Sequence, residues 1–593
     1  MVELIYSHNT NDMKKITLFF FLVGLFSFNF RLAAQEASPN YTTPPLGQNV
    51  RTMAEWEEVE ALVVTWTGAS TGFPNIIKEI IRHAKEEVKV IVICNDSIQV
   101  INYLNAFNIT TNNIYFIEDF YNSVWIRDYG ATTIYNNEVD SLYLVDWIYN
   151  RPRPFDDRIP RVLSEHQDLS LYSTTNNPYN LVNVGGNFMS DGQGNAFASK
   201  LILAENGPQS TYVTVPKTEQ EIDSIMKDFM GIKQFSKMEM LNYNPINHID
   251  MYMKLLNEET LLVGEYPNGI ADGPQIEANI QYIQDSVFTT FGTPFKIVRI
   301  PMPPDTCGNY PDYYGASCQI GSVNNYWGHY RTYTNLVFVN KTVLVPIYSY
   351  QYDTTALNIL RKELPGYNVV GINCNEMISY YGALHCITKA VGVKKPLLIV
   401  HQPLKDTTKM SQGHEVLAKI QHTSQIQTAK IYYTTDTSQG FLSVNMTLGV
   451  GDYWIGNIPS QPAGSTVYYY IHSESFSGKK QVRPITAPKG FWQFDIKATT
   501  SIPKAVLITF KLKPIYPNPS GDKLFIPIET KEKLQSDLSI FDVKGQKIMN
   551  IHEGNIPIGK SLFEINVNNL SIGTYFVVLQ TEQGKQTQKL LVK

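Results

Sequence analysis

Apolar runs of strand type and helix type alternate through the large N-terminal part of the chain, and this alternation constrains the fold most. Residues 59–66 have the length and composition of a buried strand, residues 74–84 place apolar side chains at helical spacing, and residues 88–94 are typical of a second strand. A strand, a helix and a strand in this order indicate an α/β unit. With similar patterns around residues 110–134, 219–263, 277–300 and 342–372, we count about five units, an internally repeated architecture.

The pattern changes beyond Gly392. From residue 397 to residue 496 the chain consists of short alternating runs separated by Gly, Ser, Asn and Pro, which predicts a β-sandwich of immunoglobulin-like size. A linker rich in Thr, Ser and Lys follows, and residues 505–593 again contain only strand and turn patterns. We therefore predict a second small β-domain there. The 36 Tyr and 28 Phe agree with a protein rich in strands.

The charge of the chain argues against nucleic acid as a partner. The formal net charge is -5, and the Lys and Arg residues are spread along the sequence without a basic cluster.

The N-terminus has the pattern of a secretory signal. Two lysines at residues 14–15 precede an apolar run over residues 16–28, and Leu32-Ala33-Ala34 forms a small-residue cleavage site. We predict a signal peptide over residues 1–34, with Met13 as a possible true start, and a leader over residues 35–50. The apolar run is too short for a membrane span. The mature protein is expected to be soluble and exported.

Five cysteines must then be placed in an oxidising compartment, where an odd count leaves at least one unpaired. Cys307 and Cys318 flank a loop rich in Gly, Tyr and Pro and are candidates for a small disulfide. Cys386, in the stretch Ser379 to Thr388, is the best candidate nucleophile. A lone cysteine is more often a small buried hydrophobe, so the other residues have to support that role.

Two polar clusters carry acids. In Trp125-Ile126-Arg127-Asp128-Tyr129-Gly130 an acid lies among aromatics just before a strand, and a structural ion pair between Arg127 and Asp128 is the simpler interpretation. In residues 247–253 the alternation suggests a strand on which His248 and Asp250 share a face. Such a pair suits acid/base chemistry, although a core histidine or a metal ligand pair would look the same. No motif supplies the further ligands that a metal needs.

Two further clusters are polar. Residues 184–187 and 191–195 are rich in glycine and are best interpreted as turns, since no helix pattern follows that would form a phosphate cradle. Residues 326–335 place polar groups, Asn335 among them, at the edge of a strand.

Taken in order, Trp125-x-Arg-Asp-Tyr-Gly, Gly185-Gly-Asn, His248-x-Asp and the late Cys386 resemble the agmatine deiminase and bacterial peptidylarginine deiminase family, most closely its secreted Porphyromonas-type members. The resemblance covers about residues 51–393. It implies a five-bladed α/β propeller, the pentein fold, for these residues. It also implies that the chain is a hydrolase acting on linear amidines.

The resemblance assigns roles to the site residues. Asp128 and Asp250 match the two acids that hold a guanidinium, for which paired carboxylates are chemically suited. Cys386 matches the nucleophile, His248 the proton shuttle, and Asn335 an asparagine beside the thiol. Trp125 is expected to line the substrate site. No cofactor is needed in this scheme.

Substrate choice depends on Arg151 and Arg153, which resemble paired arginines that grip the carboxylate of a C-terminal arginine; a solvated basic loop is the alternative. Secreted members carry a tyrosine three residues before the catalytic histidine, where this chain has Pro245, and Tyr243 is a candidate substitute. The expected substrates are arginine-containing peptides or proteins, converted to citrulline and ammonia.

The C-terminal segments resemble those of exported proteins. Residues 397–496 resemble an immunoglobulin-like domain, and the Tyr516-Pro-Asn-Pro and Gly573-Thr-Tyr motifs resemble the sorting domain of the type IX secretion system. Export through the periplasm by that machinery, followed by release or attachment to the cell surface, is the implied location.

Three rival functions stay open. The nearest is a deiminase for agmatine or free arginine, although agmatine has no carboxylate for Arg151 and Arg153 to bind. A thiol protease would use a cysteine and a histidine but would not need two acids for a cation. A surface adhesin with an inert N-terminal domain is the non-enzymatic alternative.

Overall fold

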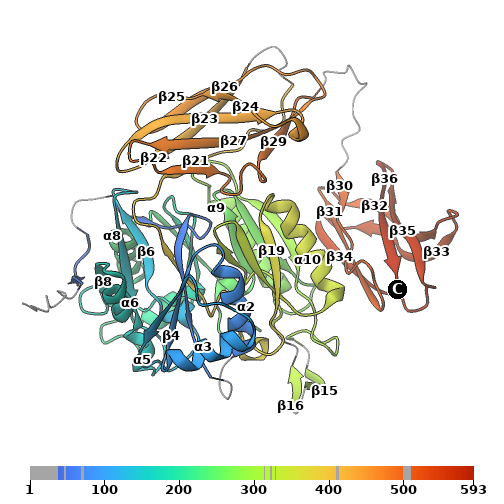
Figure 1. The fold of residues 1–593 in the computed structure, drawn as a ribbon. Helices are drawn as coiled ribbons and strands as arrows, with labels where there is room; N and C mark the ends of the chain where they lie inside the picture. The colour runs from blue at the N-terminus through green and yellow to red at the C-terminus, as the bar shows by residue number, and fades with distance from the viewer. Residues whose placement is uncertain are drawn as a thin grey trace, which may run out of the picture. The chain divides into compact units, whose positions relative to one another are not determined.

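The computed structural model describes residues 38–45, 49–68, 73–312, 314–320, 323–327, 329–408, 413–497 and 509–593, without the side chains of residues 314–327 (Figure 1). The predicted signal peptide, part of the predicted leader and the start of the predicted sorting domain lie outside these residues. The described part is a mixed α/β structure of many sheets, none of them closed, followed by β-rich segments. No helix in it is both long and apolar enough to span a membrane.

Five of the described sheets between residues 40 and 392 repeat one strand pattern. Each contains an antiparallel pair, then at least one helix, then a strand that pairs in parallel with the second strand of the pair. In four of them the strands follow the chain: β6 (Thr132–Asn136), β7 (Ser141–Trp147) and β8 (Leu171–Thr174); β9 (Met189–Ser190), β10 (Asn195–Ser199) and β11 (Gln234–Met238); β12 (Met253–Asn257), β13 (Thr260–Glu265) and β14 (Lys296–Pro301); β17 (Val337–Val339), β18 (Thr342–Ile347) and β19 (Asn368–Asn373).

The fifth sheet joins the two ends of this region. Strand β20 (Lys389–Gly392) pairs antiparallel with β3 (Val59–Thr65), which pairs in parallel with β4 (Lys89–Cys94) and through it with β5 (Ile114–Glu118). The antiparallel pair of this sheet thus joins β20, the last strand of the region, to β3 near its beginning. The loop before β20 therefore lies near residues from the beginning of the region.

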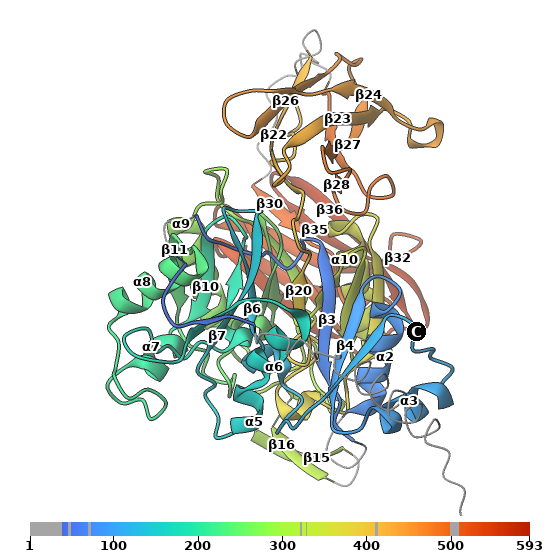
Figure 2. The same cartoon turned by 60° about the vertical axis from the view of Figure 1, so that its left-hand side comes forward.

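Helices pack on these sheets through apolar faces. Helix α2 (Pro74–Ala84) begins with a proline in its first turn and buries Ile76, Ile77, Ile80 and Ile81. Figures 1 and 2 both show this helix beside β4. The other long helices are α3 (Ser97–Ala106), α6 (Ile159–Gln167), α8 (Glu219–Met230), α9 (Gly273–Ser286) and α10 (Tyr350–Glu363).

Local sequence signals set the ends of α8. Thr218 and Glu221 form a reciprocal capping box at its start. Gly231 ends the helix with φ +69, and an added Cβ would meet the Val50 carbonyl oxygen at 1.8 Å. Glycine is therefore required there by both the backbone conformation and the space.

Two of the predicted α/β units were divided differently. Residues 110–134 do not form one unit: β5 completes the first sheet, the short helix α4 (Ile126–Tyr129) follows, and β6 begins another sheet. Residues 219–263 are likewise split, since β11 pairs with β10 whereas β12 starts a new sheet. The loop that begins at residue 119, followed by α4, separates β5 from β6, and the two strands pair with different partners. The units at 59–94, 277–300 and 342–372 match the strands and helices of the structure.

Residues 398–495 form two facing sheets around one apolar core that includes Val416, Ile431, Val467, Tyr469 and Ile471. In β27 (Thr466–Ser475) buried and partly exposed residues alternate along the whole strand, as expected for a sheet with one covered face. The remaining strands are β21 (Leu398–His401), β22 (His414–Gln421), β23 (Ile426–Thr434), β24 (Leu442–Asn445), β25 (Thr447–Leu448), β26 (Tyr453–Ile458), β28 (Lys480–Arg483) and β29 (Trp492–Asp495).

Residues 510–592 contain a second pair of sheets with their own core, which includes Leu524, Ile526, Leu538, Ile540 and Leu579. The strands are β30 (Phe510–Leu512), β31 (Lys523–Thr530), β32 (Leu534–Asp542), β33 (Lys547–Ile556), β34 (Gly559–Asn566), β35 (Gly573–Thr581) and β36 (Gly584–Val592). The prediction that the chain after residue 396 is rich in β-strands is thus confirmed.

Candidate active site

The predicted catalytic residues lie at equivalent places in the repeated sheets. Each stands in the segment that leads into the first strand of an antiparallel pair. Asp128 in α4 precedes β6, His248 and Asp250 precede β12, Asn335 precedes β17, and Cys386 precedes β20. The turn of 3-10 helix η1 (Gly185–Asn187) occupies the same place before β9. The repeat therefore brings five separate loops to one site.

The thiol of Cys386 contacts residues from two of these loops. Its Sγ lies 3.6 Å from Oδ2 of Asp250 and 3.3 Å from Nδ2 of Asn335. The cysteine is 2% exposed and Asp250 and Asn335 are fully buried. The other carboxylate oxygen of Asp250, Oδ1, is buried and has no hydrogen-bond partner among the described residues. An unpaired acceptor beside a thiol is free to receive a donor from a ligand.

Asp128 and His248 face each other across the same site. The Nδ1 atom of His248 is 3.6 Å from Oδ1 of Asp128, and neither ring nitrogen of this buried histidine has a hydrogen-bond partner among the described residues. Asp128 accepts a hydrogen bond from the backbone N–H of Gly186 at 3.2 Å. Its side chain is 15% exposed, so the site opens to solvent on this side.

Gly186 is packed against all three polar groups. A Cβ added at this position would lie 2.5 Å from Nδ1 of His248, 3.0 Å from Oδ1 of Asp128 and 3.3 Å from Oδ2 of Asp250. The glycine-rich segment was predicted to be a turn, and it is one. Its function here is to let the backbone approach the acids closely.

Two local interpretations of the sequence were wrong. His248 and Asp250 do not lie on a strand, because the chain forms the 3-10 helix η2 (Ile249–Met251) and β12 begins only at Met253. Arg127 does not pair with Asp128. Its guanidinium lies 3.4 Å from Glu55 and donates to the carbonyl of His385, so it supports the loop beneath the site.

The electrostatics of the site favour a protonated thiol. Burial, with the nearby Asp250 and Asp128 carboxylates adding to it, raises the pKa of Cys386 well above its ordinary value. Burial also raises the pKa of Asp128, with Asp250 adding to the shift and His248 opposing it. Two acids and a buried thiol thus share one enclosed space, and a cation placed there would relieve the unfavourable charge of all three.

Trp125 lies near the loop that carries Cys386. A Cβ added at Gly382 would be 2.3 Å from the Trp125 ring and 3.3 Å from Cβ of Cys386. Phe73 packs near the same indole, with ring centroids 6.5 Å apart. Aromatic side chains therefore border this loop.

Arg151 and Arg153 lie between β7 and α5 (Pro154–Asp157) and are partly exposed. Arg151 donates to the carbonyl of Asn150 and acts electrostatically on Asp128, whereas Arg153 donates to the Tyr149 hydroxyl at 3.1 Å. No carboxylate of the described residues lies within ion-pair distance of either guanidinium. Both are therefore available for an anionic group.

Tyr243 is less well connected to the site. Its side chain is 41% exposed and its backbone N–H donates to Asp272. No contact of its ring with Asp128, His248 or Cys386 is seen among the described residues.

Three residues at the site were not predicted. Glu205 is buried, accepts from the Asn150 side chain and acts electrostatically on His248, Arg151 and Asp128. Glu55 and His385 lie beneath Asp250, where His385 hydrogen-bonds to both Asp250 and Glu55. His385 adjoins the thiol in sequence and could have been suspected, but Glu55 and Glu205 carry no local signal.

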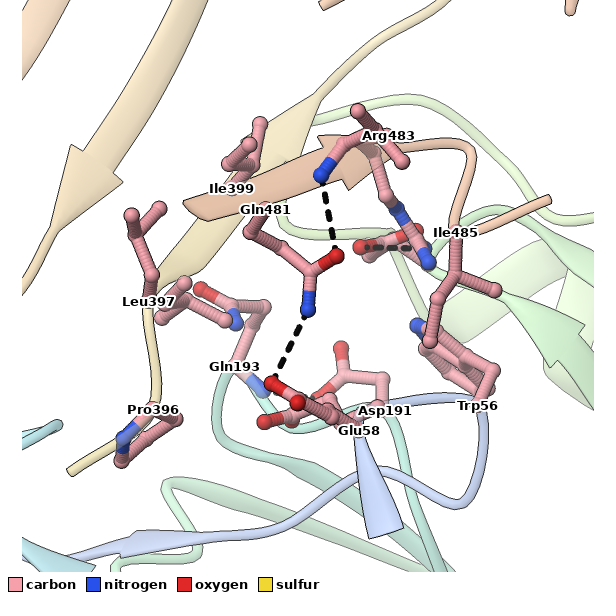
Figure 3. Close-up of a pocket in the computed structure, with 14 residues that line it drawn as sticks. Trp56, Glu58, Asp191, Gln193, Pro396, Leu397, Ile399, Gln481, Arg483 and Ile485 are labelled. Carbon is pink, nitrogen blue, oxygen red and sulfur yellow. Dashed lines mark hydrogen bonds and ion pairs between the residues drawn. The ribbon is translucent and has the colours of Figure 1, made fainter. Parts of the chain in front are cut away.

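A separate pocket lies away from these residues. It is lined by side chains that include Trp56, Glu58, Asp191, Gln481 and Arg483 (Figure 3). Gln481 donates to Glu58 at 3.0 Å, and Arg483 pairs with Glu258 at 2.8 Å. None of the predicted site residues line this pocket, and its polar groups already bind one another.

Among the cysteines, Cys94, Cys374 and Cys386 are free and buried, and Cys307 is disulfide-bonded. Cys318 falls where side chains are not described, so the predicted Cys307–Cys318 pairing stays a prediction. Burial also raises the pKa of Cys374 well above its ordinary value, but this thiol lies near Asp353 rather than near a pair of acids.

Known proteins similar to the N-terminal part of this chain are deiminases by name or by family model. The sequence model of the Porphyromonas-type peptidyl-arginine deiminases matches residues 51–391, and that of the secretion system C-terminal sorting domains matches residues 514–593. A "Putative agmatine deiminase" of Mycoplasma capricolum is 21% identical over 361 residues, covering 56% of this chain and 93% of that protein. One of Legionella pneumophila is 25% identical over 281 residues, covering 45% and 72%.

Among solved structures, the X-ray structure of a "putative agmatine deiminase" has a TM-score of 0.51 and 20% sequence identity, and the match covers 60% of this chain and 99% of that one. At this identity the likeness concerns the fold of the N-terminal part.

The repeated α/β fold, the thiol facing two acids and these likenesses together define a hydrolase of the deiminase class, which acts on guanidino groups. The chain belongs to the family of Porphyromonas-type peptidyl-arginine deiminases, whose model covers residues 51–391. Its last segment belongs to the sorting domains of a secretion system and marks the protein for export to the cell surface or beyond.

Proposed function

We propose that this protein is an exported deiminase that hydrolyses the guanidino group of a C-terminal, peptide-bound arginine to citrulline and ammonia. The observation that supports it most is the grouping of one thiol, two carboxylates and an unpartnered histidine. Sγ of Cys386 lies 3.6 Å from Asp250, and His248 lies 3.6 Å from Asp128. A planar cation that donates hydrogen bonds from several N–H groups fits between such acids.

In the proposed reaction, Asp128 and Asp250 hold the guanidinium with its carbon in front of Cys386. The bound cation stabilises the thiolate, which burial and the two acids otherwise disfavour, and the thiol proton passes to His248. The sulfur then forms a bond to the guanidinium carbon. The carbon–nitrogen bond breaks and ammonia leaves with a proton from His248. Asn335, whose Nδ2 atom is 3.3 Å from the sulfur, donates to the thiolate.

The second half of the reaction regenerates the enzyme. His248 removes a proton from water, the water oxygen bonds to the same carbon, and the carbon–sulfur bond breaks. A ureido group is left and Cys386 is restored. Overall, one guanidinium and one water give one ureido group and one ammonium ion.

The preference for peptide-bound arginine depends on Arg151 and Arg153. Both guanidinium groups are partly exposed and without an ion-pair partner in the described part of the chain, and Arg151 is within electrostatic reach of Asp128. Two arginines near the guanidinium site suit the α-carboxylate of an arginine at the end of a peptide. Tyr243, which is 41% exposed, is proposed as a third contact of the peptide.

Agmatine is the second candidate substrate, since the curated relatives carry that name. Agmatine lacks the α-carboxylate of arginine and carries a positively charged ammonium group at that end, so Arg151 and Arg153 would repel it.

Ammonia and citrulline should be measured with a peptide ending in arginine, a peptide with internal arginine, free arginine and agmatine. The proposal expects the largest kcat/KM for the first of these. Turnover of agmatine alone would contradict the peptide assignment. Absence of turnover with all four would contradict deimination of these substrates.

We further propose that residues 51–393 form a five-bladed propeller, since the five described sheets of this region repeat one strand pattern. Residues 397–496 would form an immunoglobulin-like domain and residues 505–593 a type IX sorting domain, with residues 1–34 removed as a signal peptide on passage through the periplasm. The match of residues 514–593 to a secretion system sorting domain supports this route.

A further inference from the structure

The histidine next to the nucleophile is held between two acids. Nδ1 of His385 lies 2.7 Å from Oδ2 of Asp250, and Nε2 lies 2.8 Å from Oε1 and 3.0 Å from Oε2 of Glu55. His385 is fully buried, and so is Asp250. The proposed reaction uses neither His385 nor Glu55.

The contact of His385 with Asp250 and its contact with Glu55 each need a hydrogen between the two heavy atoms. A neutral histidine carries only one N–H, whereas here each ring nitrogen faces a carboxylate oxygen that can only accept when ionised. Two protons are therefore shared among Asp250, His385 and Glu55.

Glu55 is the fixed end of this chain of hydrogen bonds. Lys254 forms an ion pair with one of its oxygens, and Arg127 lies 3.4 Å from the other. Burial opposes ionisation of Glu55, but His385, Lys254 and Arg127 outweigh it and lower the pKa of the Glu55 carboxyl well below its ordinary value. Glu55 is thus a carboxylate anchored from three sides.

The other end decides how Asp250 is oriented. His385 occupies Oδ2, while Oδ1 stays buried and without a partner among the described residues. The loop that carries His385 is also joined to the loop that carries Asn335, because the backbone N–H of His385 donates to Oδ1 of Asn335 at 2.9 Å. A carboxylate that is held through one oxygen presents the other oxygen in a fixed direction.

We infer that Glu55 and His385 are positioning residues, which fix Asp250 so that its free oxygen accepts a hydrogen bond from the guanidinium. This inference rests on the proposed function, because it names what the oriented carboxylate binds. Neither residue touches the substrate in this scheme.

Two replacements of His385 separate positioning from general structural support. In His385→Asn the amide can occupy the place of Nδ1 and still donate to Asp250. In His385→Gln the amide reaches toward Glu55 and the contact with Asp250 is lost. We expect KM for an arginine-terminated peptide to rise about 10- to 100-fold in His385→Gln and less than about 3-fold in His385→Asn. Glu55→Ala should also raise KM, and Glu55→Gln, which keeps the shape, should raise it less.

A merely structural role gives a different result. Partial unfolding removes active molecules, so apparent kcat falls while KM is unchanged. His401 provides a matched control. It is a buried histidine of the β-sandwich that bridges the Leu417 carbonyl at 2.7 Å and the Tyr469 hydroxyl at 2.9 Å. His401→Gln should lower the melting temperature without changing KM.

Equal KM values for wild type and His385→Gln would overturn the inference, and so would equal KM rises in His385→Gln and His385→Asn. Calorimetric binding of the same peptide to Cys386→Ala, with and without His385→Gln, distinguishes this from failure of the proposed function. The reaction would be refuted and the positioning role retained if the wild type released no ammonia while Cys386→Ala bound the peptide more tightly than the double variant with His385→Gln. If His385→Gln does not fold, the Glu55→Ala and Glu55→Gln pair decides by the same KM comparison.

Discussion

Sγ of Cys386 lies 3.6 Å from a carboxylate oxygen of Asp250, in a region from which solvent is almost excluded. A thiolate so close to a carboxylate is unfavourable unless a cation is also present. We therefore expect the ionisation of Cys386 to be coupled to the binding of a cation, and this coupling can be measured through the reactivity of the thiol.

Alkylation of Cys386 should depend on the charge of the reagent. Because burial and the two acids raise its pKa well above the ordinary value, the thiolate fraction at neutral pH is below that of a free cysteine and grows as the pH rises. Neutral iodoacetamide should thus label Cys386 more slowly than it labels free cysteine at pH 7, with a rate still rising above pH 9. At pH 7 the ratio of the labelling rate with cationic 2-chloroacetamidine to the labelling rate with iodoacetamide should be larger for Cys386 than for free cysteine. Peptide mass spectrometry measures both rates, and faster relative labelling by the neutral reagent would contradict the coupling.

Removing the charge of either acid should weaken guanidinium binding. In Asp128→Asn or Asp250→Asn a carboxylate of the site becomes a neutral amide, and loss of one charged partner costs about 2–5 kcal/mol, about 30- to 5000-fold in kcat/KM. Steady-state ammonia release checks this. Asp156→Asn is a useful comparison, since this buried acid accepts from Ser123 and Asn122 and is not assigned to the substrate. A drop in kcat/KM no larger than in Asp156→Asn would argue against both assignments.

Gly186→Ala should abolish most activity while the fold is kept. The added methyl group would lie 2.5 Å from Nδ1 of His248 and 3.0 Å from Oδ1 of Asp128, so at least one of these groups has to move. A 1 Å displacement in an active site is enough for about 10²-fold loss of rate. Gly68→Ala is the control, because nothing lies within 4 Å of its added Cβ. Equal activity of the two variants in the ammonia assay would show that the close approach of Gly186 is not needed.

Substrate choice should respond to Arg151 and Arg153. Replacing either by Gln removes a cation that is proposed to bind the peptide carboxylate, so KM for a peptide ending in arginine should rise about 10- to 100-fold. Turnover of agmatine should stay the same or improve, since repulsion of its ammonium group is reduced. Arg161→Gln is the matched control: Arg161 pairs with Glu165 along α6 at 2.6 Å. If peptide and agmatine kinetics change in parallel, these arginines do not select the carboxylate.

The sequence predicted the alternation of strands and helices because apolar spacing is a local signal. It did not predict which strands share a sheet, since β20 and β3 pair across more than half of the chain. The same limit applies at the site. The contact between His385 and Glu55 joins residues 330 positions apart, and no pattern around Glu55 marks it.

Short polar motifs were also ambiguous in conformation. The alternation around His248 and Asp250 fits a strand as well as a single turn, and the structure has the turn η2. Arg127 was expected to pair with its neighbour Asp128, yet the fold offers it Glu55 and the carbonyl of His385. Residue types were informative in these motifs, whereas partners depended on tertiary packing.

The central claim is that Cys386 forms the bond to the guanidinium carbon, and citrulline formation by Cys386→Ala tests it most directly. With an arginine-terminated peptide, the account predicts that citrulline from this variant is at least about 10³-fold below wild type. Cys374→Ala, which removes another free and buried thiol, should retain activity to the extent that it folds. Citrulline formation by a folded Cys386→Ala variant at a rate close to wild type would contradict the mechanism.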